Sequence, residues 1–171
     1  NVVKTTVNLI KGKNIIELSA KKGQPAPWIG KMEFLIAESP FSTEFDANIG
    51  EIKAPAFKLP DGFVGGIGFG GGELIESVNI PETGVYRCNI VYLAGEETRT
   101  MDIDINGKWT GTTYDFPKPP EWWEAQVETF DVNLQKGVNN IRFYSRNGSL
   151  GPWIGPLSFT RKYFLDTVLA V

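Results

Sequence analysis

This chain of 171 residues contains no histidine and a single cysteine. The absence of imidazole excludes every mechanism that needs a histidine base, and most zinc sites. One cysteine cannot form an intrachain disulfide, so the cysteine content indicates no compartment. Cys88 lies in the alternating stretch VYRCNIVYL, which favours a buried structural thiol over a reactive one. The catalytic groups that remain are chiefly carboxylates, lysine and tyrosine.

Positive charge and long apolar runs are also scarce. The net charge of −3 offers no basic face, which makes nucleic acid a poor choice of partner. The apolar runs are far too short to span a bilayer. Hydrophobic residues make up 42% of the chain, as in an ordinary globular protein, and the length suffices for a core without disulfides or metals.

The sequence also lacks helical periodicity, because no segment maintains it over three turns. Short alternating segments rich in Val, Ile, Thr, Phe and Tyr recur instead, separated by Gly, Pro, Asn and Asp. We predict strands at 2–9, 13–19, 31–37, 43–49, 73–80, 84–93, 98–105, 108–114, 126–134, 138–144 and 156–163. Asn106-Gly107 predicts a two-residue hairpin, since both positions accept positive φ. The pattern predicts an all-β fold, an antiparallel sandwich or barrel.

An internal repeat is present. Residues 7–37 align without a gap onto residues 132–162, and 13 of the 31 aligned positions are identical. The identical residues include a PWIG block that carries Trp28 in the first copy and Trp153 in the second. Such a repeat must be found early, because missing it leads to the wrong fold. Packing and ligand binding explain the repeated tryptophan equally well.

The repeat also bears on domain organisation. Residues 38–60 carry three prolines and lose strict alternation, so we place a boundary near Thr43. Residues 43–171 are then predicted to form a complete sandwich. Residues 1–42 are predicted to be a partial repeat with three strands, either the end of an upstream module or strands donated to another one. Three strands bury too little to stand alone, so they must dock on something.

Two motifs that resemble binding sites are better explained as structural features. The run from Gly65 to Gly72 contains GxGxxG, but a strand follows it where a dinucleotide site needs a helix. We interpret it as a flexible, closely packed loop in which backbone approaches a ligand or a neighbouring strand. Asp102-Ile-Asp104-Ile-Asn106-Gly107 begins like a calcium loop, but the twelfth position is Thr113 instead of Glu. A hairpin with Asp102 and Asp104 facing water is favoured.

The stretch Glu121-Trp122-Trp123-Glu124 places two indoles between two carboxylates. A glycosidase needs two carboxyl groups on either side of a scissile bond, and nothing pairs these two across a cleft. Adjacent tryptophans on an extended segment point to opposite sides, so one can be core and the other exposed. An exposed indole can stack on the apolar face of a sugar ring. The alternative is that both rings cover core or edge.

Several segments resemble carbohydrate-binding modules of families 6 and 35 in order and spacing, over about residues 43–162. They are Phe63-Val64-Gly65-Gly66, Pro81-x-x-Gly84-Val85-Tyr86, Tyr92-Leu93-Ala94, Asn106-Gly107, Trp122 and Leu134-x-x-Gly137-x-Asn139-x-Ile141. The resemblance implies an antiparallel jelly-roll β-sandwich, non-catalytic and usually attached to secreted enzymes that act on polysaccharides.

The resemblance also implies a ligand site in the loops at one end of the sandwich. Aromatic residues there hold a sugar between them, which carries over to Phe63 and Trp122, with Trp123 beside them. The family often reads G-P-N-I-D where this chain reads G-P-W-I-G. Trp153 therefore replaces the usual hydrogen-bonding asparagine and is a further candidate for stacking.

A structural calcium ion is a second implication of the resemblance. The family uses acidic residues of the first strand, which here are Glu44 and Asp46, with Asn48 nearby. The final family aspartate is replaced by Gly155. Because a calcium site needs six or more oxygens, this replacement weakens the prediction.

The sequence thus predicts a secreted, non-catalytic module that binds a polysaccharide or other glycan. The alternative is a structural or assembly protein in which residues 1–42 complete a sheet in a neighbouring subunit and produce oligomers or filaments. An enzyme is the least favoured class. Asn147-Gly148-Ser149 is an N-glycosylation sequon, which has meaning only on a glycosylating secretory route.

Overall fold

The computed structural model describes residues 15–25, 41–121 and 124–162. The chain divides into two units, residues 1–35 and residues 36–171. In the first unit, residues 15–20 have no regular secondary structure, and a turn follows in which the Gln24 N–H donates to the Lys21 carbonyl at 2.9 Å. The predicted strand 13–19 is therefore wrong over residues 15–19. Trp28 and the predicted strands 2–9 and 31–37 lie outside the described residues.

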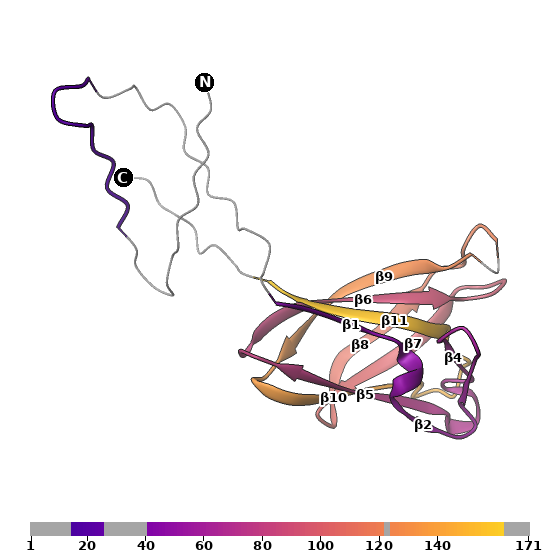
Figure 1. The fold of residues 1–171 in the computed structure, drawn as a ribbon. Coiled ribbons are helices and arrows are strands. Elements are labelled where there is room, and N and C mark those ends of the chain that lie inside the picture. The colour runs from indigo at the N-terminus through magenta and orange to yellow at the C-terminus, as the bar shows by residue number, and fades with distance from the viewer. Residues whose placement is uncertain (1–14, 26–40, 122–123, 163–171) are drawn as a thin grey trace. The chain divides into compact units, whose positions relative to one another are not determined.

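The second unit is a sandwich of two antiparallel sheets (Figure 1). One sheet has the order β3-β4-β11-β6-β9, and β1 also pairs with β11. The other has the order β2-β5-β10-β7-β8. The strands are β1 (Ser42–Phe45), β2 (Glu51–Lys53), β3 (Phe57–Lys58), β4 (Val64–Gly65), β5 (Glu73–Ile80), β6 (Gly84–Leu93), β7 (Arg99–Ile105), β8 (Lys108–Phe116), β9 (Gln126–Leu134), β10 (Gly137–Tyr144) and β11 (Trp153–Arg161). The predicted all-β sandwich is confirmed.

Two short 3-10 turns, η1 (Ala47–Ile49) and η2 (Phe69–Gly71), interrupt the strands. No α-helix occurs in the described residues, and none of their helices has the length and apolar character needed to cross a membrane. The predicted strand 43–49 is shorter in the structure, because the chain leaves β1 after Phe45 and turns into η1. The predictions missed β2, β3 and β4, whose two or three residues are too few to show alternation.

Alternation along the long strands builds the core between the sheets. In β5, Leu74, Val78 and Ile80 point inward and are buried, as two-residue periodicity requires. The largest fully buried side chains are those of Tyr86, Phe116, Phe143 and Phe159. Cys88 on β6 belongs to this core, and burial raises the pKa of its thiol. The prediction of a buried structural cysteine is confirmed.

The β7–β8 hairpin forms at the predicted turn. Asn106 and Gly107 have φ of 53° and 77°, the conformation that a tight two-residue turn demands. The start of the motif lies within β7, so Asp102 and Asp104 belong to a strand and not to a calcium loop. Our expectation that they face water is wrong, because they are only 3% and 4% exposed. They point away from the core but are covered by side chains of neighbouring strands.

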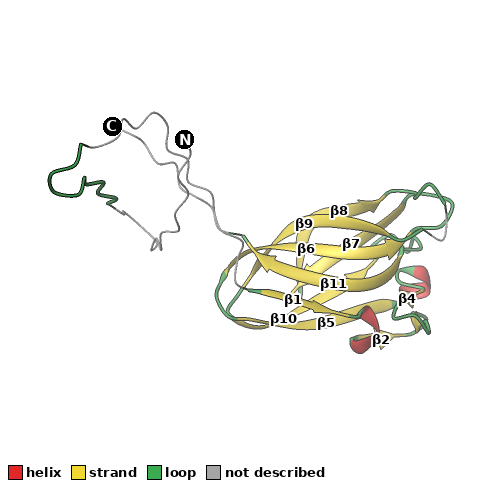
Figure 2. Ribbon diagram, turned by 45° about the horizontal axis from the view of Figure 1, so that its top comes forward, coloured by secondary structure: helices red, strands yellow, loops and turns green. Residues whose placement is uncertain are grey.

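Strand register gathers the longest connections at one end of the sandwich, which we name the loop end. Leu93 at the end of β6 pairs with Trp153 at the start of β11, and Ile154 pairs with Val64 of β4. The loop end is made of residues 54–56, 66–72, 94–98, 117–121, 124–125 and 145–152. These segments lie at the right-hand end of the sandwich in Figure 2. The short turns 81–83, 106–107 and 135–136 lie at the other end.

Candidate functional site

Hydrogen bonds hold the loops of the loop end to one another. The Gly151 N–H donates to the Ile67 carbonyl at 2.8 Å, which joins the β10–β11 loop to the glycine-rich loop. The Tyr92 hydroxyl donates to the Pro117 carbonyl at 2.9 Å and so anchors the start of the β8–β9 loop. The first bond joins two loops that are distant in sequence, and the second joins the start of the β8–β9 loop to strand β6.

The glycine-rich loop owes its composition to close backbone packing. A Cβ atom at Gly68 would stand 2.2 Å from the Ser149 carbonyl oxygen, and one at Gly72 would stand 2.3 Å from the Gly66 carbonyl oxygen. Gly68 also has a φ of 82°, which side chains rarely tolerate. Strand β5 follows the loop, so the dinucleotide reading fails and the closely packed loop is confirmed.

Trp153 begins β11 and is half-buried at the loop end. Its indole lies over Gly65 of β4: a Cβ atom at Gly65 would stand 3.0 Å from the indole nitrogen. The same Cβ atom would stand 3.0 Å from Cζ of Phe57, so both rings lie close to the one glycine. Phe57 is 48% exposed. Gly65 thus provides the space in which an exposed phenyl ring and an indole lie together, and we name Phe57 and Trp153 the aromatic pair.

A third exposed ring is that of Phe69, which is 62% exposed in η2. Its segment packs on the loop before β3, because a Cβ atom at Gly70 would stand 3.2 Å from the Pro55 ring. Neither Phe57 nor Phe69 was selected as a ligand residue from the sequence. The proximity of Pro55 and Pro60 to Phe57 was the one available signal, since prolines fix a loop that can present an aromatic side chain.

The other predicted stacking residues have different placements. Phe63 is half-buried, and its ring lies against β11, where a Cβ atom at Gly155 would stand 2.6 Å from Cε1 of the ring. Phe63 therefore packs on the sandwich, and a ligand contact by it stays a prediction. Trp122 and Trp123 lie outside the described residues. Glu121 and Glu124, on either side of them, are exposed.

The predicted calcium ligands lie at the start of the sandwich. Glu44 and Asp46 are exposed, and the Asp46 carboxyl carbon is 3.6 Å from the place of a Cβ atom at Gly62. Asn48 is half-buried in η1. Within residues 15–25, 41–121 and 124–162, no group of three or more acidic, cysteine or histidine side chains is arranged to hold a metal. Gly155, which replaces the family aspartate, is covered by Phe63. Calcium binding stays a prediction.

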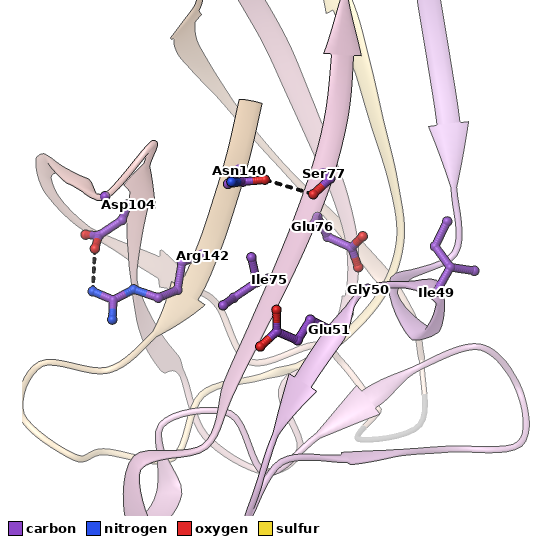
Figure 3. Close-up of a pocket in the computed structure, with 10 residues that line it drawn as sticks. Ile49, Gly50, Glu51, Ile75, Glu76, Ser77, Asp104, Asn140 and Arg142 are labelled. Atoms are coloured by element: carbon purple, nitrogen blue, oxygen red, sulfur yellow. Dashed lines mark hydrogen bonds and ion pairs between the residues drawn. The ribbon is translucent and has the colours of Figure 1, made fainter. Parts of the chain in front are cut away.

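A separate depression of about 630 Å³ lies along the five-stranded sheet and η1 (Figure 3). A chain of ion pairs crosses this sheet: Arg142 of β10 contacts Asp104 of β7 and, at 3.1 Å, Glu73 of β5. The Tyr144 hydroxyl donates to Asp104 at 2.7 Å. These contacts cover Asp104, while Asp102 accepts from the Thr113 hydroxyl and the Arg146 N–H, each at 2.7 Å.

Glu76 is the unusual carboxyl of this depression. It points inward from β5, it is 1% exposed, and its Oε1 has no hydrogen-bond partner among the described residues. Burial raises the pKa of Glu76 to about 8, while the Gly50 N–H and the Lys58 charge act in the opposite direction. A Cβ atom at Gly50 would stand 2.4 Å from Oε1, so only glycine fits above this carboxyl. No site predicted from the sequence included Glu76.

Comparison with solved structures identifies the fold. A family 35 carbohydrate-binding module from Clostridium thermocellum superposes with a TM-score of 0.62 at 25% identity, over 69% of this chain and 98% of the module. A family 35 module from Cellvibrio japonicus gives 0.56 at 21% identity, over 70% and 92% of the two chains. An exo-β-1,3-galactanase from Phanerochaete chrysosporium gives 0.62 at 19% identity, over 69% of this chain and 29% of the enzyme.

These likenesses confirm the fold expected from the resemblance, a β-sandwich of the carbohydrate-binding-module type. No protein-family model matches the sequence. No curated protein matches it either.

Proposed function

We propose that this protein binds a glycan at the loop end through the aromatic pair, without catalysing a reaction on it. The observation that carries the proposal is the nearly half-exposed Phe57 ring beside the Trp153 indole over Gly65. A flat aromatic surface at the end of a sandwich suits the apolar C–H face of a pyranose ring. The likeness to family 35 carbohydrate-binding modules supports the same function.

The loop end also carries polar groups. Lys58 follows Phe57 directly and is exposed, and Ser149 lies in the β10–β11 loop. Sugar hydroxyls need such donors and acceptors, because stacking alone fixes neither the orientation nor the identity of the ring. The proposal assigns affinity to the aromatic pair and selectivity to the polar groups around it.

The proposal also places the protein outside the cell, where polysaccharides too large to enter a cell are encountered. Support for this location comes only from the proposed ligand class. Detection of the natural protein in the culture supernatant or on the cell surface tests it, and confinement to the cytoplasm would contradict it.

A glycan array tests the binding proposal. The full chain should bind one class of glycan, and Phe57→Ala should lose that signal while keeping the thermal transition of the parent protein. Phe57 is exposed, so its removal costs little packing. Incubation of the bound glycan with the parent protein should release no new reducing ends. An array without signal, or an unchanged signal from Phe57→Ala, would remove the support for this site.

A further inference from the structure

The buried positions of the second repeat copy are the ones that the first copy preserves. Of the 31 aligned positions, eleven are buried in the sandwich, at 132, 134, 139, 141, 143, 151, 152, 154, 155, 157 and 159. Eight of these eleven are identical in residues 7–37, against five of the other twenty. The three buried exchanges are Phe143 to Leu18, Gly151 to Ala26 and Leu157 to Met32. Each keeps an apolar or small residue, as a packed core requires.

Several positions outside the core changed their chemistry instead. Arg142 corresponds to Glu17, and the exposed Val138 corresponds to Lys13. A segment that bound a partner only through its exposed side chains would preserve those side chains and vary at the buried positions. The first copy thus retains the inward-facing residues of β10, of β11 and of the end of β9 from residue 132 onward, which are useful only inside a sandwich.

Two of the retained residues fit contacts with a part of the module that precedes the repeat. Gly155 leaves room for the Phe63 ring, and Trp153 lies over Gly65 of β4. Their counterparts in the first copy are Gly30 and Trp28. In the second copy these contacts are made by Phe63 and Gly65, which lie outside the repeated segment, so the preserved features point to a partner that supplies the equivalent of β4.

The described part of the first copy lacks such cover in the isolated chain. Ile16 and Leu18 are 39% and 57% exposed, whereas their counterparts Ile141 and Phe143 are 1% and 0% exposed. Two apolar side chains at alternate positions therefore face solvent at places where the second copy buries its core. Exposed apolar residues in a core-like pattern indicate a surface that is covered by a partner.

In the sandwich of residues 41–162, the strand positions that the first copy could fill are already occupied. β10 lies between β5 and β7, and β11 lies between β4 and β6. Both places are central in their sheets and already filled. If the first copy from one chain displaced β9–β11 in another, the displaced strands would expose as much core surface as the first copy buried. Pairing between two copies of this chain would therefore bury no additional apolar surface.

We propose that residues 1–37 form the last three strands of a second sandwich by pairing with a segment of the same kind as β1–β8. The partner is a chain segment like residues 41–125, with the central positions of both sheets open. Burial of the inward-facing side chains of residues 7–37 provides the driving force. The proposal does not depend on glycan binding.

The test joins a copy of residues 41–125 directly to Asn1 of the full chain, so that Asn1 takes the place that Gln126 has after residue 125. The backbone amides of Ile16 and Leu18 should then exchange with D₂O at least a hundredfold more slowly than in the full chain, because their counterparts are paired on both sides. Differential scanning calorimetry should show about twice the unfolding enthalpy.

Matched substitutions separate pairing from the mere presence of extra chain. In the joined chain, the double change Ile16→Asp with Leu18→Asp should restore fast exchange while the sandwich of residues 41–162 stays folded. Lys13→Asp, at a position that is exposed in the second copy, should leave the protection intact. Fast exchange at Ile16 and Leu18 in the joined chain, with the added residues unfolded, would overturn the proposal.

Discussion

The indole of Trp153 lies over Gly65, and a side chain on that glycine would stand 3.0 Å from the indole nitrogen. Phe57 contacts the same glycine from the neighbouring strand. This relationship makes Gly65 a determinant of the aromatic pair although it has no side chain of its own.

Gly65→Ala should therefore weaken glycan binding about tenfold by displacing both rings, an effect of about 1.4 kcal/mol. Calorimetric titration with the glycan found on the array measures it. Gly84→Ala is the matched control, because its Cβ atom would meet nothing closer than 3.5 Å at the opposite end of the sandwich. Equal affinities for the two variants would show that Gly65 does not shape the site.

The raised pKa of Glu76 predicts a pH-dependent stability. Between the ordinary pKa of 4.5 and the folded value of about 8, the unfolded chain releases the proton of Glu76 while the folded protein retains it. Below pH 4.5 both states bind the proton, so stability is full there. It should fall as pH rises through this window, by an amount on the order of a few kcal/mol, and level off above pH 8.

Glu76→Gln should abolish that part of the pH dependence, as measured by urea unfolding at pH values from 4.5 to 8.5. Glu51→Gln, an exposed carboxyl in the same depression, should retain it. An identical pH slope in the parent protein and in Glu76→Gln would rule out Glu76 as its source.

The contact between Phe63 and Gly155 predicts that substitutions at these two positions have coupled effects on stability. Gly155→Ala brings a methyl group to 2.6 Å from the Phe63 ring, which should cost about 1–3 kcal/mol of unfolding free energy. The cost should shrink in a Phe63→Ala background, because the clash is then relieved. Denaturant unfolding of the four proteins of this double-mutant cycle measures the coupling. Additive effects would contradict the contact.

The buried side-chain amide of Asn139 should contribute strongly to the stability of the sandwich. Its Nδ2 donates to the carbonyls of Gln135 and Gly137 at 2.7 and 3.1 Å, and its Oδ1 accepts from the Gln135 N–H at 3.0 Å. Asn139→Ala should destabilise the sandwich by about 2–3 kcal/mol, because buried backbone groups lose their partners. Asn79→Ala, at an exposed position of the facing strand, should change stability by less than about 0.5 kcal/mol. Thermal unfolding distinguishes the two.

The long strands could be predicted because their alternation is set by burial on one face alone. The strands β5, β6 and β9 have the bounds that the sequence predicted. β3 and β4 could not be predicted, since two residues show no period and the strands exist only through pairing with each other and with β11. The strand predicted over residues 15–19 failed although its alternating pattern is present, because alternation alone does not form a strand without a neighbouring strand to pair with.

The candidate site was predictable only in part. The resemblance led to Trp153 and to the loop end, but the residue beside Trp153 was missed because Phe57 belongs to a two-residue strand. Asp102 and Asp104 were misplaced because their cover comes from β10 and β8, which are distant in the sequence. Glu76 was not selected although it has the same inward parity in β5 as Leu74 and Val78, because alternation places it on the core face but does not reveal how a carboxyl is accommodated there.

The central claim is that the aromatic pair at the loop end binds the glycan. Titration calorimetry of Trp153→Ala and Val138→Ala tests it most directly, because Val138 is a 66% exposed apolar residue at the start of β10, at the opposite end of the sandwich. We predict that Trp153→Ala loses at least tenfold in affinity while remaining folded, and that Val138→Ala binds like the parent protein. Retained affinity in Trp153→Ala, or an equal loss in both variants, would contradict the account.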